Sequence, residues 1–364
     1  MSRKTLEQVA AAYESVVRQS RSDREQDELY AFRATCNWLK SVLLQAHALC
    51  PNARRVVDLC CGQGSDATKV AHLRNLEHYV GIDLSRAHID EAQKRISASR
   101  KTTAMFAVAV GNCADAEELR AMPVLQKCWG ASDLVLCHFA LHYFCESRQF
   151  LTNFLRSVAA LLQPRGGLFI GTVLDWTALR QLFLARDGPR SPVLLGPPPA
   201  RRKPHWRPTA DRAARQQRCM ARMRHHAESG SRRCRMLPVA EVPEVRFQGR
   251  IRVVAPPATV AGLLQRRGGT RTEPTCGFGL RVNVCVGERL ASPEFVCDMG
   301  DVRSIAQASG LKLIFQRNLA DLALESNAAR ADPPARVFGL DVARLPTVDL
   351  ASLNAYLCFA FAKE

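Results

Sequence analysis

The stretch VVDLCCGQGSD, Val56–Asp66, decides the fold of this chain. It begins inside a short apolar run, Arg54–Leu59, of the β-branched kind that is typical of a buried parallel strand. The run ends before Gly62 and Gly64, and Asp66–Leu73 is then expected to start a helix. A strand, a glycine turn and a helix bring backbone N–H groups close to a ligand with little side-chain bulk between them. The stretch therefore predicts a ligand site in an open α/β fold.

A second strand is expected at Tyr79–Ser85, with Asp83 at its carboxyl end. An acid in that position can accept both hydroxyl hydrogens of a ribose. Gly62, Gly64 and Ala67 also satisfy a loose G-x-G-x-x-A pattern, and Asp83 follows at about the dinucleotide spacing. From these residues alone, a dinucleotide site and a tight turn without a ligand both stay open.

Asp58, an acid inside the first strand, favours a different cofactor. A buried carboxylate needs a partner, and the ammonium group of a bound amino acid provides one. An amino-acid end, a ribose and an adenine together describe S-adenosylmethionine. The methyltransferase interpretation is therefore preferred over NAD.

Composition sets further limits. The chain has 364 residues, 47% of them apolar, and no apolar run of 18 residues or more, so no membrane span is expected. Its start lacks a signal-peptide core, and its 14 cysteines form no C-x-x-C pair, which argues against a metal site. A net charge of +17 points to a polyanionic partner. Much of that charge lies in Arg201–Arg235, which either contacts RNA phosphates or is a solvated insertion.

Strands alternating with helices through residue 173 predict a right-handed, doubly wound parallel sheet. A helix-compatible segment, Thr5–Arg18, precedes a long helix, Asp23–Leu49, and Arg186–Arg235 is expected to be disordered or loosely helical. The other expected helices are Arg86–Ser99, Phe150–Leu162 and Val302–Ser309, and the other expected strands are Ala104–Val110, Asp133–His138, Leu168–Val173, Gly277–Val286, Leu311–Gln316 and Asn354–Ala362.

Several polar and aromatic residues are candidates for the site. His142 and Tyr143 follow a strand end and favour a binding role, whereas neighbouring Phe144 is expected in the core. Asn112 or Asp115 could reach an adenine amino group. Asn37 and Lys40 lie three apart on the first helix; from position alone, solvated residues are favoured over a patch delivered to the glycine turn.

Longer blocks resemble the messenger RNA cap guanine-N7 methyltransferases over nearly the whole chain outside the insertion. Phe139 to Thr172, FALHYFCES…LLQPRGGLFIGT, is similar to the family's FALHYAFES…L.PGG.FIGT block. Asn37–Ser41 resembles its NNWIKS helix, with Cys36 in place of the first asparagine. The end of the chain, Tyr356–Lys363, is similar to its terminal strand.

The resemblance implies a seven-stranded Rossmann-like α/β sheet with helices on both faces, an N-terminal helical extension and a basic insertion. It implies N-terminal helices at 1–50, an S-adenosylmethionine-binding half at 51–186, a flexible insertion at 187–245, and cap-pocket strands with the rest of the sheet at 246–364. The implied activity is methyl transfer from S-adenosylmethionine to guanine N7 of a capped mRNA 5′ end, in the nucleus. Other capping enzymes, a triphosphatase or guanylyltransferase, are implied as partners, and no membrane.

The resemblance also assigns roles to residues. Cofactor contacts are implied for Lys40, Asp58, Gly62, Asp66, Asp83, Asn112 and His138, and cap contacts for Arg95, Phe139, His142, Tyr143, Glu294 and Tyr356. A carboxylate such as Glu294 can accept from guanine N1–H and the 2-amino group together. Because N7 loses no proton when it is methylated, no catalytic acid or base is expected.

The chain departs from the family in the same regions. Cys60, Gln63 and Ser65 replace residues of VLDLGCGKGGD, and Val282 and Val284 stand where the family's Y-x-F strand has aromatics. These changes leave open a non-catalytic cap-binding subunit that keeps the fold. An S-adenosylmethionine enzyme with another substrate is a third possibility.

Overall fold

The computed structural model describes residues 27, 29–46, 52–98, 103–178, 244–248, 251–255, 278–286, 290–328, 336–337, 340–341 and 350–364. The predictions made for Thr5–Arg18 and Arg186–Arg235 lie outside these residues. The long helix predicted at Asp23–Leu49 is described as α3, Tyr30–Ala46. No helix within the described residues is both long and apolar enough to cross a membrane.

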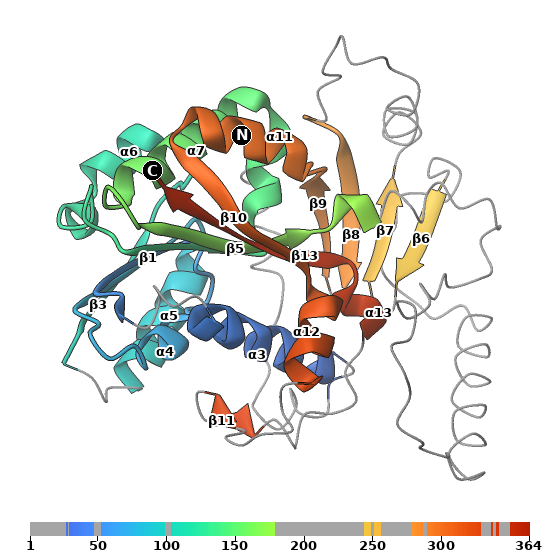
Figure 1. Ribbon diagram of the computed structural model, residues 1–364, viewed down its shortest axis with the longest axis horizontal. Helices are drawn as coiled ribbons and strands as arrows, with labels where there is room; N and C mark the ends of the chain where they lie inside the picture. The colour runs from blue at the N-terminus through green and yellow to red at the C-terminus, as the bar shows by residue number, and fades with distance from the viewer. Residues whose placement is uncertain are drawn as a thin grey trace.

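A seven-stranded sheet forms the centre of the molecule, in the order β10-β13-β5-β4-β1-β2-β3 (Figure 1). The strands β1 to β5 run parallel, and β13 is antiparallel to both of its neighbours. The predicted α/β sheet is confirmed. The strands are β1 Arg55–Leu59, β2 His78–Asp83, β3 Met105–Val110, β4 Leu134–His138, β5 Leu168–Leu174, β10 Leu311–Asn318 and β13 Tyr356–Lys363.

Helices cover both faces of this sheet (Figure 1). One face carries α6 Ala116–Ala121, α7 Arg148–Leu161 and α11 Met299–Ala308, and the other carries α3, α4 Ala67–Val70, α5 Arg86–Ala98 and α12 Leu319–Ala328. The helix predicted from Asp66 is shorter than expected, since α4 ends at Val70. Ser85 caps α5 as predicted, because its hydroxyl accepts from the backbone of His88.

A second, four-stranded antiparallel sheet lies beside the first; of its strands, β8 was predicted, within Gly277–Val286. It consists of β6 Glu244–Gln248, β7 Ile251–Ala255, β8 Arg281–Val286 and β9 Leu290–Phe295. Pro293 lies within β9, and a proline weakens any strand prediction because it cannot donate to the ladder. The strand forms because β9 is the last strand of its sheet, where proline is tolerated.

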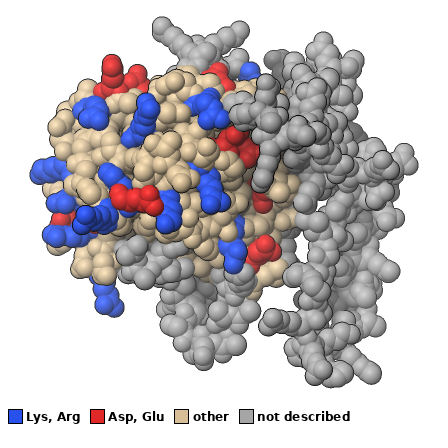
Figure 2. Space-filling model, turned by 45° about the horizontal axis from the view of Figure 1, so that its top comes forward, with Lys and Arg blue, Asp and Glu red and all other residues tan. Residues whose placement is uncertain are grey.

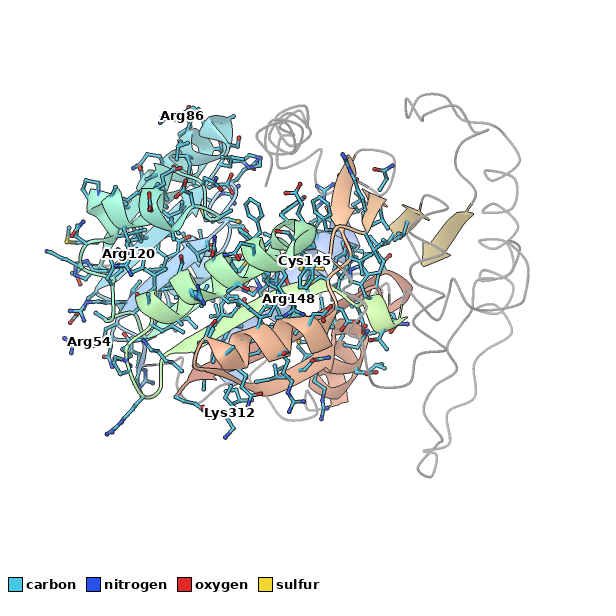
Figure 3. All side chains as sticks on the ribbon, turned by 90° about the horizontal axis from the view of Figure 1, so that it is seen from above. Arg54, Arg86, Arg120, Cys145, Arg148 and Lys312 are labelled. Atoms are coloured by element: carbon cyan, nitrogen blue, oxygen red, sulfur yellow. The ribbon has the colours of Figure 1, made fainter. Side chains whose placement is uncertain are left out.

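The remaining elements are short: η2 Pro123–Leu125, η3 Leu141–Glu146, α13 Leu350–Leu353, and the paired strands β11 Arg336–Val337 and β12 Leu340–Asp341. The element η3 follows β4 directly and leads into α7. Its Phe144 ring stacks on Phe154 of α7 at 3.8 Å between centroids, which confirms Phe144 as a core residue. Cys145 and Arg148 mark this junction in the view from above (Figure 3).

The turn after β1 depends on its glycines. Gly62 and Gly64 have φ values of +53° and +67°, in the left-handed region that favours glycine. A Cβ on Gly64 would lie 2.9 Å from the Cβ of Ala92 on α5, whereas a Cβ on Gly62 would meet nothing within 4 Å. Gly64 thus lets α5 pack under the turn, and Gly62 leaves the space above the turn open.

Substituting Gly64 by Ala is expected to destabilise the fold more than substituting Gly130 by Ala. Both glycines have nearly the same φ, +67° and +65°, so the backbone strain is matched, but Gly130 has no neighbour within 4 Å of an added Cβ. The contact with Ala92 should cost Gly64→Ala about 1–3 kcal/mol more in the free energy of unfolding. Urea unfolding of both variants measures the difference; equal losses would contradict the packing argument.

Candidate functional site

The predicted cofactor residues gather at the carboxyl ends of β1, β2 and β4. Asp58 lies within β1, Asp83 ends β2 and His138 ends β4, and these strands are neighbours in the sheet. The carboxyl edge of such a sheet is where open α/β folds bind ligands. The structure therefore brings together residues that are up to 80 positions apart in the chain.

Asp66 is the most strongly bonded of these groups. It is only 4% exposed, and its two oxygens accept from Lys40 on α3 and Lys69 on α4, each at 2.8 Å. Burial alone would raise the pKa of Asp66, but the two ammonium groups hold that pKa well below its ordinary value. Lys69 also donates to the side chain of Asn37 at 3.1 Å. The expectation that Asn37 and Lys40 are solvated residues was wrong: both belong to the turn's polar network.

Asp58 is buried deeper, at 1% exposure. Its Oδ2 accepts from the hydroxyl of Tyr79 at 2.7 Å. Burial raises the pKa of Asp58 to about 7, and the negative charge of Asp66 acts in the same direction. A buried acid whose pKa lies that high responds strongly to an added cation, and a ligand's ammonium group is such a cation.

Asp83 is held in place from several sides. Its Oδ2 accepts from the backbone N–H of Gly62 at 2.8 Å, and its Oδ1 accepts from that of Ser85 at 3.0 Å. Nδ1 of His88 lies 3.5 Å from Oδ1. Because an ionised carboxylate has about four acceptor positions, Asp83 retains capacity for a ribose.

His138 presents an unpaired nitrogen to the same edge. Its Nδ1 lies 3.4 Å from Oγ1 of Thr172, while its buried Nε2 has no hydrogen-bond partner among the residues that the structure describes. Burial lowers the pKa of His138 to about 3, so the ring is neutral near pH 7. Buried polar atoms are normally paired, and an unpaired Nε2 here fits a ligand that supplies the partner.

A second group of residues, the predicted guanine pocket, lies next to this edge. Phe139 follows β4 with φ of +57°, a strained conformation for an aromatic residue. Its ring meets that of Tyr356 edge-on, with 5.1 Å between centroids. Nζ of Lys40 lies 5.3 Å from the centroid of the Phe139 ring. Lys40 therefore contacts Asp66 on one side and the aromatic group on the other.

His142, Tyr143 and Glu294 complete this pocket. The His142 and Tyr143 rings are 4.1 Å apart, and Nε2 of His142 lies 3.4 Å from Oε2 of Glu294 on β9. The side chains of His142 and Glu294 are buried, at 3% and 6% exposure. Burial lowers the pKa of His142 to about 3, so this ring is neutral as well. The residues of the predicted pocket thus include a carboxylate, a neutral imidazole and aromatic rings.

For the other predicted site residues, Arg95 and Asn112, the structure shows which element each belongs to or follows. Arg95 lies in the last turn of α5, three residues after the Ala92 that packs under the turn. Asn112 follows β3, and its Oδ1 accepts from the backbone of Ala114. Asp115, the alternative to Asn112, caps α6 by accepting from Glu117 and Glu118. Both side chains therefore take part in local hydrogen bonds with the backbone, and the choice between Asn112 and Asp115 stays a prediction.

Val282 lies opposite Glu294 in the β8–β9 register, so the two side chains share one face of the sheet. Val282 and Val284 are both buried, at 1% and 0% exposure. These small side chains line the region where the family's strand has aromatics. The expectation of a reduced pocket wall stays a prediction.

Two participants in the site were missed in the sequence. Lys69 has a readable signal, because it lies three residues after Asp66 at the start of a helix, a spacing that favours ion pairs. Tyr79 has no such sequence signal, because its partner Asp58 is on another strand and a tyrosine in a strand is ordinarily a packing residue.

Comparison with known proteins gives this geometry a context. A model of the mRNA (guanine-N(7))-methyltransferase domain matches residues 1–189, more than half of the chain. The chain belongs to this family. It is 32% identical over 185 residues to mRNA cap guanine-N(7) methyltransferase 1 of Arabidopsis thaliana, a match covering 50% of this chain and 48% of that one. The Drosophila melanogaster mRNA cap guanine-N(7) methyltransferase is 29% identical over 195 residues, covering 49% and 44%. The chain spans about half the length of the curated relatives it matches.

The family match stops before two of the pocket residues. Glu294 and Tyr356 lie outside residues 1–189, yet Glu294 is beside His142 and Tyr356 is beside Phe139. The fold itself thus connects the rest of the chain to the part that matches the family model.

Cys60, which stands in place of a family glycine, gives a prediction for the turn. It has φ of +60°, which costs a non-glycine residue about 1–2 kcal/mol. Its thiol interacts with those of Cys113 and Cys137, so the side chain has neighbours of its own. Cys60→Gly is expected to bind S-adenosylhomocysteine as tightly as the parent or more tightly, because the strain is relieved.

Cys60→Ala is the matched control, since it removes the thiol but keeps the Cβ and the strained φ. Calorimetric titration of both variants separates the two contributions. Much weaker binding by the folded Cys60→Gly protein would mean that the cysteine side chain supports the site.

Proposed function

We propose that this protein transfers a methyl group from S-adenosylmethionine to N7 of the guanine of a capped mRNA 5′ end. The supporting observation is the position of Lys40, whose ammonium group joins Asp66 to the ring of Phe139. One lysine thereby links the polar edge suited to an amino acid and ribose with the aromatic pocket suited to a base. Methyl transfer needs these two ligands side by side.

The residues at the sheet edge fit the cofactor. Asp58 and Nε2 of His138 face the methionine end, Asp83 the ribose, and Asn112 the adenine side. Lys40, Asp66 and the open turn at Gly62 complete the assignment. When bound, S-adenosylmethionine supplies an electrophilic methyl group on its sulfonium. The chain's own contribution is to orient that group and keep water from it.

The second pocket fits a guanine. The Glu294 carboxylate can accept from N1–H and the 2-amino group, and the neutral ring of His142 can donate to the 6-oxo group. Phe139, Tyr143 and Tyr356 offer rings for stacking. Arg95 is assigned to the cap triphosphate.

No residue needs to act as a general base. Guanine N7 carries a free lone pair, so its methylation requires only that the two reacting atoms be held in line at about 3–3.5 Å. The burial of the site residues and their mutual bonds serve this purpose by fixing side-chain positions. The reaction is therefore assigned to positioning, with no catalytic acid or base.

Capped mRNA as substrate, a nuclear location and association with other capping enzymes follow from the same proposal. Lys and Arg side chains are spread over the face above α6, α7 and α11, with acidic side chains between them (Figure 2). A dispersed positive surface favours encounter with RNA without defining a path for it.

The direct test is transfer of a labelled methyl group from S-adenosylmethionine to GpppN-capped RNA, followed by nuclease digestion to locate the label. Label on guanine N7 is the expected result. Cap binding without transfer would instead support the alternative, a capping-complex subunit without turnover. Label on another atom would refute the N7 assignment.

Glu294→Gln tests guanine recognition. The amide keeps the shape of the side chain but turns an N–H₂ group toward one of guanine's donors. Loss of a charged hydrogen bond and an unpaired buried donor should cost about 2–4 kcal/mol, on the order of 30- to 1000-fold in affinity for a GpppG analogue. Cofactor affinity should hardly change, because Glu294 is assigned only to the nucleotide.

Paired titrations with GpppG and S-adenosylhomocysteine measure both effects. Glu117→Gln, an exposed carboxylate on α6, is the matched control. Unchanged GpppG affinity in Glu294→Gln would remove this residue from the pocket.

A further inference from the structure

Tyr79 lies directly behind the cofactor edge and has no part in the assignments above. It is on β2, fully buried, with its ring 5.2 Å from that of Phe106 on β3. Its hydroxyl reaches across to β1 and donates to Oδ2 of Asp58 at 2.7 Å. Tyr79 and Asp58 thus form a buried polar contact. A sheet face that served only for packing could be apolar throughout and would not need this contact.

We propose that Tyr79 is a positioning residue for the cofactor, holding Asp58 as an oriented, ionised acceptor for the ammonium group of the methionine moiety. The inference rests on the proposed function in one respect, that the ligand is S-adenosylmethionine. Tyr79 touches neither the ligand nor the reacting atoms; it acts through Asp58.

The charged groups around Asp58 show why such a donor is needed. Asp66 opposes ionisation of Asp58, while Lys40 and Lys69 favour it. Both ammonium groups are, however, hydrogen-bonded to Asp66 rather than to Asp58. The thiol of Cys61 also interacts with the charge of Asp58. Tyr79 is thus a neutral donor that stabilises the Asp58 carboxylate without competing with a ligand for charge.

The phenol also fixes the direction of the carboxylate. With Oδ2 accepting from Tyr79, Oδ1 is the oxygen left to face the ligand. A hydrogen bond to the ionised form favours that form, so its removal makes Asp58 harder to ionise. An ammonium ligand should then bind only at higher pH.

The experiment compares two ligands on the full chain by calorimetry between about pH 6 and about pH 8.5. S-adenosylhomocysteine carries the ammonium group, and 5′-methylthioadenosine lacks it. In the parent, S-adenosylhomocysteine affinity should rise about tenfold from pH 6 to pH 8, as Asp58 ionises, while 5′-methylthioadenosine affinity stays flat.

Tyr79→Phe keeps the ring and removes only the donor. It is expected to bind S-adenosylhomocysteine at least about fivefold more weakly at pH 7, with affinity still rising at the upper end of the range. Its affinity for 5′-methylthioadenosine should match the parent's. Tyr30→Phe, which removes an exposed hydroxyl at the start of α3, is the control and should behave as the parent.

Asp58→Asn provides a second readout, since it keeps an acceptor for Tyr79 but cannot ionise. Its S-adenosylhomocysteine affinity should be low and independent of pH. A purely structural role for Tyr79 would instead weaken both ligands equally and leave the pH midpoint unchanged, and that result overturns the inference. Failure of the parent to bind S-adenosylhomocysteine overturns the cofactor assignment and this inference together. Absence of methyl transfer to capped RNA, with the pH response intact, counts only against the proposed function.

Discussion

The buried ion triad of Lys40, Asp66 and Lys69 is the constraint on which the site depends. Three segments, α3, the glycine turn and α4, meet through one carboxylate that is 4% exposed. An isolated buried carboxylate is expensive, and two ammonium groups at 2.8 Å make its ionisation favourable. Removal of Asp66 would leave two buried ammonium groups without their shared carboxylate, so this residue holds α3 and α4 at the turn.

The same triad connects the predicted cofactor edge to the predicted guanine pocket. Lys40 contacts both Asp66 and the ring of Phe139, whose own position is set by a strained backbone. The N–H of Phe139 donates to both the carbonyl and the hydroxyl of Thr172 on β5, which stabilises that strained conformation. Strain of this kind persists only where the surroundings determine it fully, and it is common at binding sites.

How well the sequence predicts each part of this structure depends on how far apart in the chain the interacting residues lie. Parallel strands such as β1 and β4 are largely buried and mostly apolar, so their positions are readable from short windows. The position of strand β9 cannot be read in this way. Its proline argues against a strand, and only the pairing with β8 compensates for it. The role of Lys40 in the cofactor edge came from the family resemblance and not from its helix position. Helix position indicated solvent, because the carboxylate that buries Lys40 lies 26 residues away. Tyr79 was missed for the same reason: its partner is on another strand.

The departures from the family affect two properties of the proposed guanine pocket differently, its hydrogen bonding and its apolar wall. The groups that can form hydrogen bonds with guanine, His142 and Glu294, are present and 3.4 Å apart, whereas the neighbouring strand carries Val282 and Val284 in place of aromatics. Hydrogen-bonding groups reject a wrong base strongly because a mismatch leaves buried polar atoms unpaired, while apolar wall area contributes to affinity for any base. A pocket with these polar groups and a smaller wall should therefore lose affinity before it loses selectivity. Since Val282 lies opposite Glu294 on the same face of the sheet, the smaller wall adjoins a recognition group without replacing it.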